Sequence, residues 1–106
     1  DRNASMLGEL LDPWSPVALR LIGALAREGA RAKVAVSVCG EAASDPLLAI
    51  VLVGLGITSL SMTPVALAQV REVLDAVSMT RARRLAQLAI RQLDSTAARH
   101  VVGEAI

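Results

Sequence analysis

Hydrophobic residues in the first third of the chain predict a helix with one buried face. Between residues 16 and 28, apolar side chains recur every three or four positions, which is the period of a half-buried helix. Ser15 can cap this helix, Pro16 suits its first position, and Gly29 is a typical ending. We expect the stripe that faces the core to contain Val17, Leu21, Ala24, Leu25 and Glu28 near its centre, with Leu19, Ile22 and Ala26 widening it.

Two short apolar segments lack this helical period and predict strands. Residues 33–38 are β-branched and apolar enough for a buried strand, and residues 58–62 predict a second short strand. Between them, residues 46–53 are apolar throughout and predict a short buried helix. Asp45 can cap that helix, and Pro46 suits its first position.

The rest of the chain predicts three more helices. The first follows Thr63 and ends near Ala76, and the second starts after Ser78 and is broken at Asp94. The last begins near residue 96 and continues toward the end of the chain. Residues after Thr63 are therefore expected to form helices separated by short breaks.

The order of these elements predicts an α/β fold. Strands that are separated by a helix pair in parallel through a right-handed crossover, and continuous apolar strands need helices on the faces of their sheet. Two strands alone make a poor sheet, with both edges open. We therefore expect the chain to be part of a larger domain.

Composition supports the same expectation. Of the 106 residues, 54% are hydrophobic, yet the chain has one Trp and neither Phe nor Tyr. A self-contained core normally uses aromatic side chains for bulk, so part of the core is expected to lie elsewhere. The first residue is Asp and no secretory leader follows, so we expect the chain to begin partway through a longer one.

Charge argues against nucleic acid as a partner, and the uncharged segment does not predict a membrane span. The chain has 11 basic and 10 acidic residues, so it lacks the basic excess of a nucleic-acid-binding domain. No charge occurs from residue 46 to residue 70, but only residues 47–57 are densely apolar and no basic cluster flanks them. A buried helix, a loop and a buried strand explain this segment better than a membrane helix.

Cys39 is the only cysteine, and it follows the first predicted strand. Chemistry in α/β folds collects at the carboxyl ends of strands, which favours a functional residue. A free cysteine is also a common small buried hydrophobe, and its position alone leaves both interpretations open. A single cysteine forms no internal disulfide, as is typical of a reducing compartment.

Four segments match, in order and in spacing, the motifs of one protein family. They are Asp1-Arg2-Asn3, the segment DPWSPVALRLI at residues 12–22, the segment VCGEAASD at residues 38–45, and the segment VGLGITSLSMT at residues 53–63. With these motifs the chain resembles enzyme I of the phosphoenolpyruvate:sugar phosphotransferase system, a phosphoenolpyruvate–protein phosphotransferase. The resemblance covers nearly the whole chain.

This resemblance implies a fold. Residues 1–106 would form the C-terminal portion of a phosphoenolpyruvate-binding (β/α)8 TIM barrel, containing its last two strands with their helices and the terminal helices. A complete barrel needs about 250 residues, so the upstream strands and the family's phosphohistidine domain would lie outside this chain.

The resemblance also implies an activity and residue roles. In the family, phosphoenolpyruvate gives its phosphoryl group to a histidine, which passes it to a phosphocarrier protein in sugar uptake, and pyruvate is released. Cys39 would be the proton donor to the enolate of pyruvate, a role that suits a thiol because it is more acidic than a serine hydroxyl. Arg2 would bind the substrate's phosphate or carboxylate, Gly40 would let the backbone approach it, and Glu41 would orient the loop or hold a water.

Further expectations concern cofactor, partners and location. The family's Mg²⁺ would be held by residues upstream of this chain, and the parent protein would be a cytoplasmic enzyme that meets a phosphocarrier protein through another domain. We expect the isolated chain to be inactive and to self-associate. His100 has no visible sequence partner and is expected to be a surface or packing residue with no role in the chemistry.

Two other interpretations remain open. Pyruvate phosphate dikinase and phosphoenolpyruvate synthase share the cysteine loop, although they fit residues 60–62 less well. A piece with a purely assembling or regulatory role is the third possibility.

Overall fold

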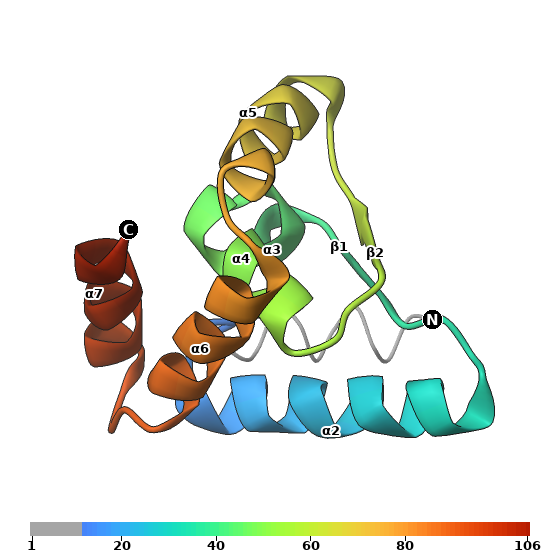
Figure 1. Ribbon diagram of the computed structural model, residues 1–106, viewed down its shortest axis with the longest axis horizontal. Coiled ribbons are helices and arrows are strands. Elements are labelled where there is room, and N and C mark those ends of the chain that lie inside the picture. The colour runs from blue at the N-terminus through green and yellow to red at the C-terminus, as the bar shows by residue number, and fades with distance from the viewer. Residues whose placement is uncertain (1–11) are drawn as a thin grey trace.

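A computed structural model describes residues 12–106, apart from the side chain of Glu41 (Figure 1). Its helices and strands are α2 (Pro16–Ala32), β1 (Ser37–Cys39), α3 (Glu41–Ser44), α4 (Pro46–Gly54), β2 (Ser59–Ser61), α5 (Pro64–Asp75), α6 (Met79–Ile90) and α7 (Ser95–Ala105). The predicted order of one helix, a strand, a helix, a strand and three helices is confirmed. The single-turn helix α3, between the first strand and α4, was not predicted.

The two strands form a parallel pair, as predicted. Ser37 lies opposite Ser59, Val38 opposite Leu60, and Cys39 opposite Ser61. Each strand has three residues, so both are shorter than the segments that predicted them.

The prediction of a buried strand is wrong. Side chains alternate between the two faces of a sheet, and only Val38 and Leu60 pack against the hydrophobic core. The other face carries the small side chains of both strands, which are exposed: Ser37, Cys39, Ser59 and Ser61. Within residues 12–106, helices therefore cover one face of the pair and leave the other open.

Helix α4 lies at the centre of the core. Its residues from Leu48 to Leu52 have at most 1% of their surface exposed. A helix that is apolar all round is buried on all sides, and α4 contacts α2, α3, α5, α6 and α7. This accounts for the long uncharged segment of the sequence. No helix in the described part of the chain is both long and apolar enough to cross a bilayer.

Glycine at position 54 permits the close packing of α4 on α6. A methyl group on Gly54 would collide with the backbone carbonyl of Ala82 and lie 3.0 Å from the Cβ of Ala86. The backbones of α4 and α6 can therefore approach each other closely, because the residues at their contact are small on both helices.

Helix α2 continues beyond Gly29, so the prediction that this glycine ends it is wrong. The helix ends at Ala32, and Lys33 caps it in the left-handed conformation with φ of 59°. Gly29 is needed for packing instead, because a methyl group there would collide with the side chain of Val36 and lie 2.8 Å from the carbonyl oxygen of Val34. The chain returning toward β1 runs directly over this glycine.

The buried face of α2 also differs from the predicted one. Val17, Leu21 and Leu25 are 67%, 46% and 53% exposed, whereas Leu19 and Ala26 are buried. Apolar residues occupy so much of this helix that its period does not fix which side faces the core. Contact with α4 and α6, which the sequence does not show, selects the side that contains Leu19.

Replacing Gly54 with Ala is expected to destabilise the protein by about 2–3 kcal/mol, because the added methyl group forces the backbones of α4 and α6 apart. Urea unfolding of the two proteins measures this difference. Gly103→Ala is the matched control, since its methyl group would lie 3.8 Å from Leu47 Cδ1, an ordinary contact. That change is expected to leave stability unchanged or raise it slightly through helix propensity. Equal effects of the two substitutions would contradict the packing argument.

Candidate functional site

Cys39 is the last residue of β1, at the edge of the sheet where both strands end. Its strand partner is Ser61, and the N–H of Gly40 donates to the carbonyl oxygen of Ser61 at 3.2 Å. The thiol is exposed. The interpretation of Cys39 as a buried hydrophobe is therefore wrong, and its predicted place at a strand's carboxyl end is confirmed.

Gly40 turns the chain sharply after the strand. Its φ of 85° and ψ of −151° are strained for any residue with a side chain, so the turn requires glycine. A Cβ at this position would meet no atom within 4 Å. The requirement is therefore conformational, and the space in front of this backbone is open.

The segment after Gly40 is a compact loop. Glu41 begins helix α3, and the Ser44 hydroxyl donates to the Gly40 carbonyl oxygen at 3.1 Å, which closes the turn. Ala43 is fully buried beneath it. The structure thus brings together Cys39, Gly40 and the backbone of Glu41, whereas the predicted ligand residue Arg2 lies outside the described residues.

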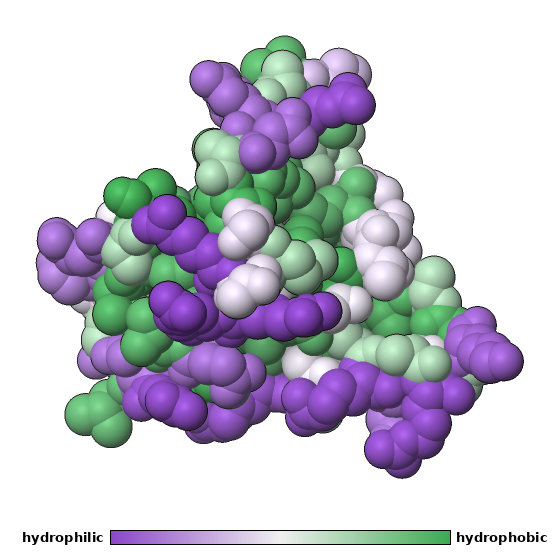
Figure 2. Space-filling view, viewed as in Figure 1, coloured by the Kyte–Doolittle hydropathy of each residue, from purple (hydrophilic) through white to green (hydrophobic). Residues whose placement is uncertain are grey.

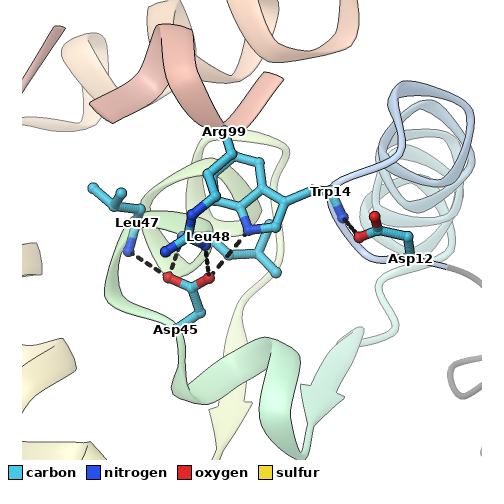
Figure 3. Close-up of polar contacts among 6 residues, drawn as sticks. All are labelled: Asp12, Trp14, Asp45, Leu47, Leu48 and Arg99. Atoms are coloured by element: carbon cyan, nitrogen blue, oxygen red, sulfur yellow. Dashed lines mark hydrogen bonds and ion pairs between the residues drawn. The ribbon is translucent and has the colours of Figure 1, made fainter. Parts of the chain in front are cut away.

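Asp45 joins this loop to two distant parts of the molecule (Figure 3). Its Oδ1 accepts hydrogen bonds from the backbone N–H groups of Leu47 at 3.1 Å and Leu48 at 3.4 Å, so the predicted helix cap is confirmed. Its Oδ2 accepts from the indole Nε1 of Trp14 at 3.1 Å and from the guanidinium of Arg99 at 2.7 Å. Sequence reasoning missed both of these contacts.

The three side chains form a compact polar cluster on the edge of the core, the Trp14–Asp45–Arg99 cluster. Trp14 is 6% exposed, and the guanidinium of Arg99 lies 5.6 Å from the centre of its ring, within the range of a cation–π contact. Asp12 accepts from the backbone N–H of Trp14 at 2.9 Å and so fixes the turn before α2. The cluster connects this turn, the start of α4 and helix α7.

The cluster lowers the pKa of Asp45. Burial alone would raise the pKa of this carboxyl group, but four effects outweigh it: the hydrogen bonds from Trp14 and Arg99, the backbone N–H of Leu48, and the charge of Arg99. Asp45 is therefore held ionised in the folded protein.

Other candidate residues lie away from Cys39. His100 is exposed on α7, with its Nε2 3.9 Å from a carboxylate oxygen of Glu104, so of the two predicted alternatives it is a surface residue and not a packing residue. Met62 lines an apolar groove of about 290 Å³ between β2 and α5, which does not include Cys39. Among residues 12–106, no group of three or more His, Cys, Asp or Glu side chains could hold a metal ion.

Comparison with known proteins identifies the family. Residues 1–79 match the PEP-binding domain of the PEP-utilising enzymes. The chain therefore belongs to the PEP-utilising enzymes. The predicted resemblance to phosphoenolpyruvate–protein phosphotransferases is likewise confirmed by curated relatives of that name.

Three relatives show the range of the similarity. The phosphoenolpyruvate-protein phosphotransferase of Streptomyces coelicolor is 43% identical over 100% of this chain and 19% of its own length. A phosphoenolpyruvate-dependent phosphotransferase system protein of Escherichia coli is 32% identical over 96% of this chain and 14% of its own length. The phosphoenolpyruvate synthase of Pyrococcus furiosus is 40% identical over 69% of this chain and 9% of its own length. The chain thus spans less than a fifth of each relative.

Acidification is expected to weaken the fold through Asp45. Because its pKa is lower in the folded protein than in the unfolded chain, its stabilisation is complete above the ordinary carboxyl pKa of about 3.9 and is lost as pH falls through the lower, folded value. Urea unfolding at several pH values between about 2 and 7, followed by Trp14 fluorescence, measures this loss.

The Asp45→Asn variant tests the origin of that pH dependence. Asparagine still caps α4 but carries no charge for Arg99, so the variant should be less stable near pH 7 and less sensitive to acid. Asp94→Asn is the control, because Asp94 Oδ1 accepts from the N–H of Ala97 at 2.8 Å to cap α7 and has an exposed side chain. Acid sensitivity that is the same in Asp45→Asn and wild type would refute the assignment.

Proposed function

We propose that this chain is the C-terminal part of a phosphoenolpyruvate-binding (β/α)8 barrel, with β1 and β2 as its last two strands. The supporting observations are the parallel pairing across a helix, the open face of small side chains, and the match to the PEP-binding domain. The parent protein is a phosphoenolpyruvate–protein phosphotransferase of about the length of its relatives, and this chain provides one wall of its active site.

The observation that carries this proposal is the exposed thiol of Cys39 at the carboxyl edge of the strands. In the proposed reaction, the P–O bond of phosphoenolpyruvate breaks as a histidine of another domain takes the phosphoryl group. The bridging oxygen keeps the electron pair, which leaves the enolate of pyruvate. Cys39 then gives its Sγ proton to the terminal carbon of the enolate, pyruvate forms, and the thiolate regains a proton from water.

Three other residues have supporting roles in this proposal. Arg2 binds the phosphate or carboxylate of the substrate, because a guanidinium matches such anions with two parallel hydrogen bonds. Gly40 lets the ligand approach the backbone, in keeping with the open space in front of it. Glu41, at the start of α3, orients the loop or holds a water.

Cofactor and partners follow from the same proposal. As the family resemblance implies, Mg²⁺ would be held by residues of the parent outside this chain. Within residues 12–106, no group of three or more His, Cys, Asp or Glu side chains could hold a metal ion. The phosphoryl group would pass from the histidine to a phosphocarrier protein in sugar uptake, within the cytoplasm. Neither nucleic acid nor a membrane is a partner in this scheme.

A second candidate function is that of a phosphoenolpyruvate synthase or pyruvate phosphate dikinase. The 40% identity to the phosphoenolpyruvate synthase of Pyrococcus furiosus favours it. Such a parent would need a nucleotide for turnover. A purely assembling or regulatory piece, with no activity of its own, is the third candidate.

Replacing Cys39 with Ser in the full-length parent is expected to lower pyruvate release by about 100-fold, within the range that general acid catalysis contributes. Phosphorylation of the parent by phosphoenolpyruvate should continue, since it precedes protonation of the enolate. Pyruvate is measured with Mg²⁺ and phosphoenolpyruvate, with and without nucleotide. Ser61→Ala, at the paired position of β2, is the control.

Three results would decide between the candidates. Equal rates of pyruvate release by wild type and Cys39→Ser would show that Cys39 is not the proton donor. A requirement for nucleotide would favour the second candidate, and absence of pyruvate with and without nucleotide would argue against both enzymatic candidates.

Expressed alone, the chain is expected to be inactive and to form dimers or larger assemblies. The outer edges of β1 and β2 have no strand partner within residues 12–106, and the face with Cys39 is uncovered. Val65 and Leu67 of α5 are 76% and 50% exposed, and Figure 2 shows apolar surface beneath that helix. Light scattering over a range of concentrations tests the expectation, and a monomeric mass throughout would contradict it.

A further inference from the structure

The loop from Cys39 to Asp45 is held at its two ends by different means. Its first end is fixed within the sheet, where the N–H of Gly40 donates to the carbonyl oxygen of Ser61 at 3.2 Å. Its second end is Asp45, whose carboxylate is shared between the start of α4 and two distant side chains. The position of the loop therefore depends on what holds Asp45.

The two carboxylate oxygens of Asp45 accept hydrogen bonds from different parts of the chain. Oδ1 accepts only local hydrogen bonds, from the N–H groups of Leu47 and Leu48. Oδ2 accepts from Trp14, 31 positions away in sequence, and from Arg99, 54 positions away. The contact with Arg99 is the shortest of the four at 2.7 Å, and it joins opposite charges, which makes it the stronger kind of hydrogen bond.

Arg99 belongs to helix α7, which packs tightly against the hydrophobic core. Its neighbour Ala98 and the next inward-facing residue, Val102, are both fully buried, so the core fixes helix α7 beneath the guanidinium. The guanidinium lies over the buried ring of Trp14, 5.6 Å from the ring centre, while the Arg99 side chain as a whole is 55% exposed. Figure 3 shows Arg99 reaching from α7 over the indole to the carboxylate.

We propose that Arg99 is a positioning residue for the Cys39 loop. By holding Asp45 Oδ2, it ties the terminal helix α7 to the junction of α3 and α4 and so sets where the loop presents the thiol. This inference rests on the proposed function of Cys39, because a fixed loop matters for activity only if the thiol acts on the substrate. Charge alone does not specify the position; the planar guanidinium also restricts the directions in which it can donate to the carboxylate.

Kinetics of the full-length parent test the proposal. Arg99→Ala is expected to lower kcat for pyruvate release about tenfold while KM for phosphoenolpyruvate changes less than about twofold, because a misplaced donor slows protonation after binding. Arg99→Lys, which retains the charge, should recover part of the loss. Arg31→Ala is the control, since it removes an exposed pair with Glu28 at 3.3 Å on α2 and should leave both constants unchanged. Wild-type kcat in Arg99→Ala would overturn the proposal.

Hydrogen exchange in the same proteins separates positioning from general destabilisation. In Arg99→Ala, the amide of Gly40 and those of α3 are expected to exchange about tenfold faster, while the amides of Leu85 and Ala86 in the α4–α6 contact keep their wild-type rates. An equal increase at all of these amides would show a global loss of stability and overturn the proposal. No increase at Gly40 would overturn it as well.

The two hypotheses fail in different ways. If Cys39→Ser releases pyruvate like wild type, the proposed function fails and the exchange experiment alone decides whether Arg99 holds the loop. If Cys39→Ser releases pyruvate much more slowly than wild type, but Arg99→Ala keeps the wild-type kcat and wild-type rates of amide hydrogen exchange, the proposed function stands and the positioning role is wrong.

Discussion

Burial of α4 is the constraint on which the remaining architecture depends. Its residues from Leu48 to Leu52 leave almost no surface exposed, so other elements must surround the helix on every side. The backbone groups at its first turn still need partners, because a buried helix end without them is costly. Asp45 meets that need, and through its second oxygen it also draws the segment before α2 and helix α7 against the same end of α4.

The arrangement around α4 places the candidate chemistry. The strands lie against the core through Val38 and Leu60, which leaves the alternate residues, Cys39 among them, on the outer face. Parallel pairing brings the ends of both strands to the same edge, and the sharp turn at Gly40 leads from that edge directly back to α4. A buried helix and an exposed thiol are thus separated only by one turn of α3.

Local features of the sequence predicted most of the fold. Each long helix starts at a residue whose side chain accepts from the first turn: Ser15, Asp45, Thr63, Ser78 and Asp94. The caps Ser15, Asp45 and Ser78, the helix start at Thr63 and the two strands were predicted. The last helix starts at Ser95, one residue before its predicted start, with Asp94 as its cap. Such signals act over three or four residues, and a single sequence displays them.

Long-range packing is what the sequence did not show. Gly29 and Gly54 are required because elements from other parts of the chain pack directly against them. Which face of α2 is buried is also determined by packing against distant elements. The candidate site likewise contains one part that the sequence predicted and one part that it did not. The location of Cys39 followed from strand and loop patterns, but the contacts of Asp45 with Trp14 and Arg99 have no periodic signal. The lone tryptophan was the available hint, because a single large aromatic side chain is a strong candidate for a specific buried contact.

The small side chains on the open face of the strands have a consequence for volume. Ser37, Cys39, Ser59 and Ser61 together fill little space, whereas the inside of a barrel is ordinarily filled by large branched residues. Any element that encloses this face must therefore supply most of the bulk that fills the interior, and where it does not, a gap is left beside these four residues. Any gap left there lies at the end of the sheet where the exposed thiol of Cys39 is, so the thiol stays accessible from that side.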